Sequence, residues 1–230
     1  MAKKNVKQAD KNLEGIEQAL TRSEQFIEDN QKILTYILGG LIVILLIIIG
    51  GKRYYLNPLN EEAAAEMFYA ERFFENDSFN LALNGYGTYP GFLSVIDDYG
   101  LTKSAKVAHY YAGVCFHQLG QHEEAIRYLG KFKTDDLLVG AAKYSTMGDS
   151  YVELGELDKA ASAYRNGIDK FENEFSSPIM LKKLGILYEE IGELEKALET
   201  YRTIESRYPE SQEGREIKKY IGRAESKMSL

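Results

Sequence analysis

Three histidines and one cysteine are the side chains of this 230-residue chain best suited to metal binding or nucleophilic chemistry. His109 and His117 are eight residues apart, His122 follows closely, and no carboxylate pair stands beside them at a metal-ligand spacing. We therefore expect surface or packing roles for all three. Cys115 is the single cysteine, which excludes an internal disulfide and a cysteine-rich metal site. We interpret it as a small core residue rather than a reactive thiol.

Two other patterns could in principle carry chemistry. The stretch GYGTYPG, residues 85–91, has neither the G-x-G-x-x-G spacing of a phosphate-binding loop nor a preceding strand, and it contains Pro90. The acidic pairs Asp97-Asp98 and Asp135-Asp136 fit helix ends and solvated faces better than general acid–base catalysis. We expect no enzyme, no metal site, no cofactor and no small-molecule substrate.

Charge and composition narrow the remaining classes of protein. From residue 61 onward there are 20 basic and 29 acidic side chains, a net charge of −9, whereas residues 1–32 are neutral with six of each. A nucleic-acid partner is disfavoured because phosphate binding needs a basic surface. Four prolines, no tryptophan, and abundant Ala, Leu, Glu and Lys indicate an all-α fold.

An uncharged apolar run occupies residues 33–51, ILTYILGGLIVILLIIIGG. As a helix it would be about 28 Å long, close to the hydrocarbon thickness of a bilayer. Lys32 and Lys52-Arg53 flank it, and Tyr54-Tyr55 follow at interfacial depth. The alternatives are a buried core helix, disfavoured by the lack of any polar face, and a cleaved signal peptide. The following GGKRYYLNP has no small-x-small cleavage site, so we predict an uncleaved anchor in the lipid bilayer.

The orientation of this anchor is less strongly encoded. Two basic residues lie within 20 residues on each side of the apolar run, so the nearby positive charges favour neither orientation. The six basic residues of the tail favour an N-terminus in the cytoplasm, and the reverse orientation would give a cytoplasm-facing scaffold. Within the tail, residues 9–30 predict an amphipathic helix from Leu13, Ile16, Leu20 and Ile27, with a partly ordered charged leader as the alternative.

The remainder of the chain repeats itself. VELGELDKA at 152–160 returns as EEIGELEKA at 189–197, and a third, weaker copy precedes them. The shared pattern is A-G-x-x-F-x-x-L-G at 112–120, M-G-x-x-Y-x-x-L-G at 147–155 and L-G-x-x-Y-x-x-I-G at 184–192. Each copy is followed by an alanine, which is Ala125, Ala160 or Ala197. A period of 35 to 37 residues with this pattern resembles the tetratricopeptide repeat.

Each repeated residue type has a physical role in a helix pair. The first glycine (113, 148, 185) allows helix A to approach its neighbour closely, and the second (120, 155, 192) ends helix A in a left-handed conformation. Phe116, Tyr151 and Tyr188 fill the wedge between helices A and B. Because no unit buries its apolar face alone, three or more must stack.

We therefore predict an N-terminal transmembrane helix followed by a tetratricopeptide-repeat α-solenoid. The parts are a cytoplasmic tail 1–32, the transmembrane helix 33–51, a linker 52–62, the repeat domain 63–210 and a C-terminal capping helix 211–230. The repeat domain comprises a degenerate repeat 63–105 with a loop insert 76–91, and full repeats 106–139, 141–174 and 178–210. The Gly, Asn and Pro content of the insert is typical of a loop.

The resemblance to tetratricopeptide repeats implies that helix A of each repeat lines a concave protein-binding groove. The residues expected there are Tyr110, Val114, His117, Ser145, Asp149, Val152, Lys182, Ile186 and Glu189. These residues do not reproduce the Lys/Asn clamp that grips a C-terminal carboxylate, and their mixed apolar and acidic character suits an extended or helical protein segment. The alternative for Tyr110 and Val114 is packing between repeats.

The junction between tail, anchor and repeats is similar to one known family. QFIEDNQK at 25–32 leads directly into the apolar run, which ends GGKRYY, and AAAEMFY at 63–69 starts the repeats. This order resembles the ancillary subunit of the bacterial SecYEG translocon, a single-pass inner-membrane protein with periplasmic tetratricopeptide repeats. The resemblance implies a non-enzymatic scaffold whose partners are the translocon, periplasmic chaperones and secretory clients. The alternative is a structural adaptor of another envelope assembly, in cell division or outer-membrane biogenesis.

The apolar run generates a direct prediction. A helix that spans the bilayer resists alkaline carbonate, whereas a peripheral protein is released. We expect the intact chain to remain in the membrane pellet after a carbonate wash, as detected by immunoblot. Replacing Leu41 and Leu45 together by Arg should move the chain to the supernatant, and release of the unmodified chain would contradict the anchor.

Overall fold

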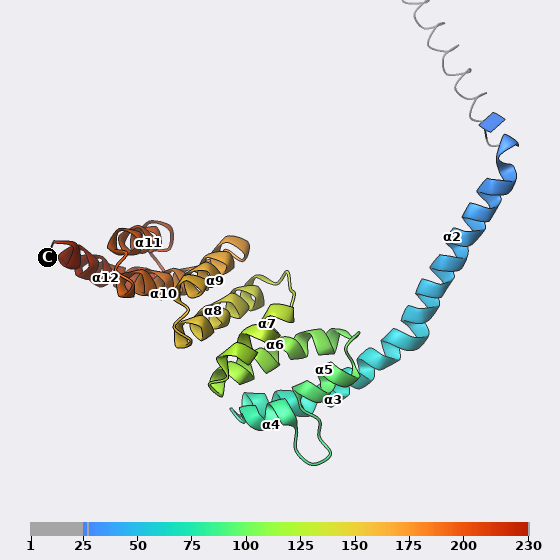
Figure 1. The fold of residues 1–230 in the computed structure, drawn as a ribbon, viewed down its shortest axis with the longest axis horizontal. Coiled ribbons are helices and arrows are strands. Elements are labelled where there is room, and N and C mark those ends of the chain that lie inside the picture. The colour runs from blue at the N-terminus through green and yellow to red at the C-terminus, as the bar shows by residue number, and fades with distance from the viewer. Residues whose placement is uncertain (1–24, 27, 230) are drawn as a thin grey trace, which may run out of the picture. The chain divides into compact units, whose positions relative to one another are not determined.

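The computed structural model describes residues 25, 26 and 28–229 (Figure 1). Most of the amphipathic helix predicted for residues 9–30, including Leu13, Ile16, Leu20 and Ile27, lies outside these residues. The chain divides into two compact units, Met1–Pro58 and Leu59–Leu230. Each unit is considered by itself.

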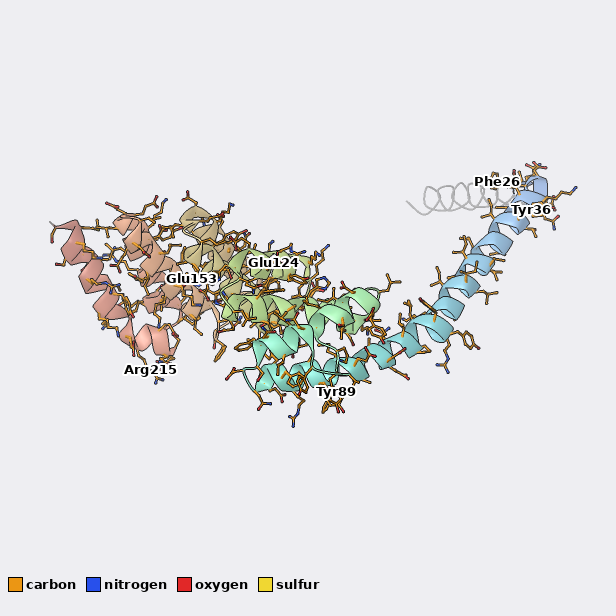
Figure 2. All side chains as sticks on the ribbon, turned by 60° about the horizontal axis from the view of Figure 1, so that its bottom comes forward. Phe26, Tyr36, Tyr89, Glu124, Glu153 and Arg215 are labelled. Atoms are coloured by element: carbon orange, nitrogen blue, oxygen red, sulfur yellow. The ribbon has the colours of Figure 1, made fainter. Side chains whose placement is uncertain are left out.

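The first unit contains the apolar run. Helix α2, Gln31–Gly51, has no buried residue, and Figure 2 shows the side chain of Tyr36 projecting away from it, 79% exposed. This exposure does not fit a helix buried in a core. Among the described residues, the helical stretch Gln31–Glu75 is the one long and apolar enough to cross a membrane.

Residues 52–62, expected as a linker, are helical. A π-helical turn, Lys52–Leu56, follows α2, and α3 spans Asn57–Glu75. Pro58 directly follows the π-helical turn inside the helical stretch Gln31–Glu75, where it has no backbone N–H to donate, and the local departure from α-helical geometry accommodates this missing donor.

The second unit is built from helices that follow one another in a stack (Figure 1). After α3 come α4 (Phe79–Asn84), α5 (Phe92–Asp98), α6 (Lys103–Gln118), α7 (His122–Lys131), α8 (Leu137–Glu153), α9 (Leu157–Lys170), α10 (Ser177–Glu190), α11 (Leu194–Arg207) and α12 (Gln212–Met228). Apart from an isolated bridge between Tyr86 and Tyr89, the described residues form no β-structure. The predicted all-α solenoid is confirmed.

The helix pairs α6–α7, α8–α9 and α10–α11 correspond to the full repeats expected at 106–139, 141–174 and 178–210, but α6, α8 and α10 begin earlier than predicted, at Lys103, Leu137 and Ser177. Gly120, Gly155 and Gly192 end the first helix of each pair with φ of 74°, 72° and 82°. After Gly120, the N–H of Gln121 donates to the carbonyl of Phe116 at 2.8 Å, which closes the helix end as a Schellman motif does. The role predicted for these glycines is confirmed.

The two helices of a pair meet closely at the first glycine of the repeat. A Cβ added to Gly148 would lie 2.3 Å from the ring of Tyr164, and one added to Gly185 would lie 2.3 Å from the ring of Tyr201. In the first repeat the corresponding neighbour of Gly113 is Leu129. The predicted close approach is therefore present in all three repeats. Ala125, Ala160 and Ala197 are fully buried beneath it.

The insert 76–91, expected as a loop, requires a correction. Residues 79–84 form the short helix α4, because Ala82 and Leu83 are buried against α5 and α6. The turn that follows begins at Gly85, with φ of 82°, and ends where the ring of Tyr89 lies 4.0 Å from that of Tyr69. The insert thus contributes to the core of the degenerate repeat instead of lying free in solvent.

The glycine contacts predict a specific stability effect. Gly148→Ala should lower the free energy of unfolding by about 1–3 kcal/mol, because the new methyl group must displace the Tyr164 ring. The matched control is Gly222→Ala in α12, where no atom lies within 4 Å of the added Cβ. That substitution should stabilise by up to about 1 kcal/mol through helix propensity. Denaturant unfolding followed by circular dichroism measures both, and equal effects would contradict the close approach.

Candidate functional site

A cavity of about 400 Å³ opens between α6, α8 and α10. Tyr110 forms one side, the first turns of α8 form the second, and the α9–α10 connection with the start of α10 forms the third. The lining residues are Tyr110, Leu138, Val139, Ala141, Ala142, Ser145, Phe175, Ser176, Ile179 and Met180. All but Tyr110 and the two serines are wholly apolar, so the cavity is an apolar recess within the repeats.

The α8 wall is positioned by its cap. The carboxylate of Asp136 accepts hydrogen bonds from the N–H groups of Leu138 and Val139, both at 2.9 Å, which fixes where α8 begins. The opposite wall is held by Asn173, whose Oδ1 accepts from the N–H groups of Phe175 and Ser176 at 3.0 and 2.8 Å. Leu138 and Phe175 are consequently held at the mouth of the cavity, 54% and 73% exposed.

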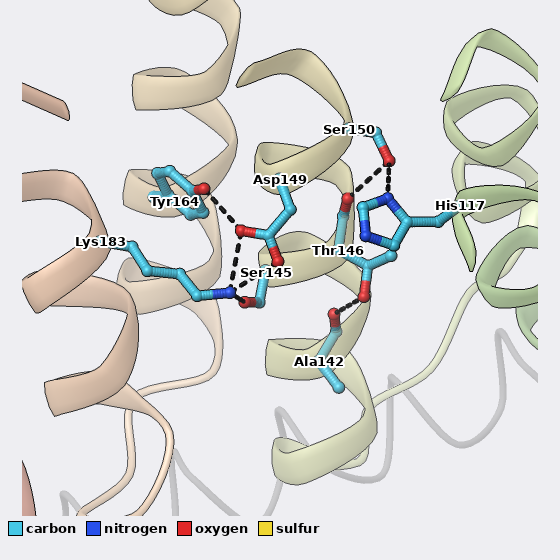
Figure 3. A network of polar contacts seen from close by, with 8 residues as sticks. All are labelled: His117, Ala142, Ser145, Thr146, Asp149, Ser150, Tyr164 and Lys183. Carbon is cyan, nitrogen blue, oxygen red and sulfur yellow. Dashed lines mark hydrogen bonds and ion pairs between the residues drawn. The ribbon is translucent and has the colours of Figure 1, made fainter. Parts of the chain in front are cut away.

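A polar network beside the cavity ties α8 to α10 (Figure 3). Lys183 Nζ donates to Asp149 Oδ2 at 2.6 Å and to Ser145 Oγ at 3.0 Å. The Tyr164 hydroxyl donates to Asp149 Oδ1 at 2.7 Å. Burial and the adjacent Asp149 carboxylate raise the pKa of Tyr164, so its hydroxyl remains a donor. The network neutralises the Asp149 charge within the repeats.

The other side of α8 contacts α6 through His117. Its Nδ1 lies 2.9 Å from Ser150 Oγ, and the Ser150 hydroxyl donates to the carbonyl of Thr146 at 2.8 Å (Figure 3). Because that hydroxyl proton is used, Nδ1 carries the proton donated to Ser150. Burial lowers the pKa of His117, so the ring is neutral at pH 7. His117 therefore links two repeats through a hydrogen bond.

Glu189 has a different environment from the groove position expected for it. Its side chain is 4% exposed and accepts hydrogen bonds from Tyr201, Arg223 and Lys227 at 2.7, 2.6 and 3.0 Å. Burial alone would raise the pKa of this carboxyl, but these three donors lower it to about 2. Lys182 likewise turns to α12, where Nζ lies 3.0 Å from Glu213 Oε1. Both residues attach α12 to the last repeat.

The remaining residues predicted for the groove divide into three groups. Tyr110 and Ser145 line the cavity, and His117 and Asp149 belong to the polar network. Ile186 is 38% exposed, whereas Val114 is half-buried and Val152 packs on the core of the last two repeats. Tyr110, Ser145 and Asp149 thus lie close together in the structure, whereas Lys182 and Glu189 contact α12.

Several residues around the cavity were missed by the repeat pattern. Leu138 and Phe175 lie at helix starts or in connections, where the repeat consensus specifies nothing. Ile179 precedes Lys182 by one helical turn and could have been found by extending the same face of α10 toward its start. Lys183 could have been suspected only from its contact with Asp149, 34 residues away.

The side chains first considered for chemistry take structural positions. Cys115 is fully buried, and burial raises the pKa of its thiol to about 12, which suppresses the nucleophilic thiolate. His109 Nδ1 lies 2.8 Å from the Ala105 carbonyl oxygen within α6. Over the part of the chain that the structure describes, no three His, Cys, Asp or Glu side chains gather as metal ligands.

Comparison with known proteins identifies the repeats. A family model described as tetratricopeptide repeat matches residues 145–211, and a second model of the same description matches residues 107–136. The fold is that of a tetratricopeptide-repeat α-solenoid. No curated protein matches the sequence.

Solved structures show the same architecture. The MamA protein aligns over 74% of this chain and 89% of its own, with a TM-score of 0.54 and 20% identity. A putative kinesin light chain with nearly identical TPR-like repeats from Podosopora anserina covers 73% of this chain and 86% of its own, with a TM-score of 0.55 and 14% identity. At these identities the similarity concerns the fold alone. Tetratricopeptide repeats such as those matched here imply a protein-interaction scaffold.

The Glu189 contacts predict a pH-dependent contribution to stability. A carboxyl with a pKa of about 2 in the folded state and near 4.5 in the unfolded chain stabilises the fold above pH 4.5 and loses this effect as the pH falls toward 2. Glu189→Gln should therefore cost about 2 kcal/mol at pH 7 and progressively less below pH 4.5. Urea unfolding at pH 7, 4 and 3 measures the difference. The control Glu205→Gln, at an exposed position, should change little, and a pH-independent cost of Glu189→Gln would contradict the ionic contribution.

Proposed function

We propose that the chain is a membrane-anchored scaffold that holds a protein segment in the groove of its repeats. The observation that carries this proposal is the apolar cavity bounded by Tyr110, Leu138 and Phe175. Large exposed apolar side chains around a recess are typical of binding surfaces.

The anchor is the second part of the proposal. Residues 33–51 span the lipid bilayer once, with the N-terminus in the cytoplasm and the repeats in the periplasm. The exposed apolar surface of α2 supports the membrane location, and the six basic residues of the N-terminal tail support the orientation. Confinement to the membrane surface raises the effective concentration of the groove, so that even weak contacts can be occupied.

The finer assignment is to protein export. The resemblance of residues 25–69 to the ancillary translocon subunit favours a position beside SecYEG, where the groove would meet emerging secretory proteins or periplasmic chaperones. The groove comprises Tyr110, Val114, His117, Ser145, Asp149, Val152 and Ile186, extended by Leu138, Phe175 and Ile179. Lys182 and Glu189 are left out because they hold α12.

Crosslinking in living cells tests this function. A photoreactive amino acid at Tyr110 or Ile186 of the full chain should capture a translocon subunit, a chaperone or a secretory client. The matched control places the same residue at Gly130, an exposed position of α7 outside the groove, where these products should be absent.

Two results would redirect the proposal. Products at Tyr110 and Ile186 that contain only cell-division or outer-membrane assembly proteins would move the scaffold to another envelope complex. A cytoplasm-active reporter fused after Leu230 would reverse the orientation, and no specific product at either position would contradict the groove.

A further inference from the structure

We infer that the cavity between α6, α8 and α10 selects protein segments in which large apolar side chains are flanked by lysine or arginine, and discriminates against acidic segments. This inference rests on the proposed function and specifies the partner of the same groove. It follows from two separate properties of the cavity, the composition of its walls and the charge at its mouth.

The walls admit apolar side chains and disfavour polar ones. Of the two serine hydroxyls in the lining, Ser145 Oγ accepts from Lys183 Nζ at 3.0 Å, and Ser176 Oγ accepts from Asn173 Nδ2 at 2.5 Å. Each hydroxyl oxygen already accepts one hydrogen bond and the rest of the lining is almost wholly apolar, so a polar side chain entering the cavity would lose water with little compensation. The volume of about 400 Å³ falls within the range of pockets that bury whole ligands.

Acidic residues adjoin the lining residues of the cavity in the chain. Asp135 and Asp136 immediately precede Leu137 and Leu138, and Glu174 immediately precedes Phe175. Within the described residues, none of these three acids forms an ion pair, although Asp136 accepts the N–H groups that cap α8 and Glu174 borders a separate recess that Arg207 also lines. The segments 133–138 and 172–176 contain one basic residue, Lys133, and the second acid of the connection, Glu172, is paired with Arg207.

The lysines nearest the cavity do not offset this charge. Lys183 is neutralised by Asp149 at 2.6 Å. Lys143 is buried, and its Nζ donates to the carbonyl of Phe132 at 2.7 Å, away from solvent. A segment with basic residues on either side of its apolar anchors therefore gains attraction at the mouth, whereas an acidic segment is repelled. The net charge of −9 beyond residue 60 steers basic segments in the same direction.

The chain offers a clean optical test because it contains no tryptophan. Phe175→Trp places a single indole at the mouth of the cavity, in the full-length protein held in detergent. Three synthetic peptides of equal length serve as probes. The first carries Leu-Phe-Leu between lysines, the second carries Leu-Phe-Leu between glutamates, and the third carries Ser-Ser-Ser between lysines.

The lysine-flanked apolar peptide should shift the tryptophan emission to shorter wavelength and bind at least tenfold more tightly than the glutamate-flanked peptide at low salt. The difference should shrink at high salt, since screening weakens exposed charge pairs. The serine peptide should not bind. Ala142→Leu, which fills the cavity from α8, should abolish binding while helical circular dichroism stays unchanged.

Charge variants distinguish the effect of the acids next to the cavity from the effect of the net charge of the whole domain. Asp135→Asn with Glu174→Gln should reduce the preference for lysine flanks several-fold and leaves the Asp136 cap of α8 intact. Asp97→Asn with Glu205→Gln removes the same charge at exposed positions elsewhere and should preserve the preference.

The outcomes distinguish this inference from the function on which it rests. Equal or tighter binding of the glutamate-flanked peptide would overturn the inference and leave the scaffold function standing. Failure of every peptide to bind would also overturn it, and crosslinking at Tyr110 and Ile186 would then decide the function separately.

Discussion

The close approach of paired helices at a glycine is the constraint on which the domain depends. Because Gly148 has no side chain, the Tyr164 ring can lie against the backbone of α8, and its hydroxyl then reaches Asp149. Tyr201 does the same over Gly185 and reaches Glu189. In both repeats the carboxylate is held where a cation of the next helix in the stack can join it, which is Lys183 of α10 for one and Arg223 of α12 for the other. One missing methyl group therefore determines packing within a repeat and the polar link to the next.

Much of this architecture is readable from the sequence because the repeat pattern is local. The glycine at the end of each A helix was predicted from the repeat pattern and is confirmed at every full repeat, and the alanine that recurs after it is buried in each B helix. In the last repeat, the position of a residue within the repeat predicts its environment less well. Lys182 and Glu189 were expected to face the groove, yet both pair with side chains of α12.

The cavity was harder to predict because its mouth is made by connections and not by consensus positions. Leu138 is placed by the Asp136 cap, and Phe175 by the hydrogen bonds of Asn173, so both depend on the exact conformation of a few backbone groups. The insert 76–91 shows the same difficulty. Its glycines and proline are typical of a loop, but burial of Leu83 was enough to form α4 within it.

The position of α8 has a mechanical consequence. Ser150 joins it to α6 through His117, while Ser145 and Asp149 join it to α10 through Lys183. Side-chain hydrogen bonds and one ion pair thus link α8 to both neighbouring A helices, so a displacement of α6 or α10 away from α8 must break one of these links. A bound polypeptide that pulls on one repeat would therefore also load the contacts of α8 with α6 and α10. The force would be shared between these two sets of contacts before the helices of any one pair separated.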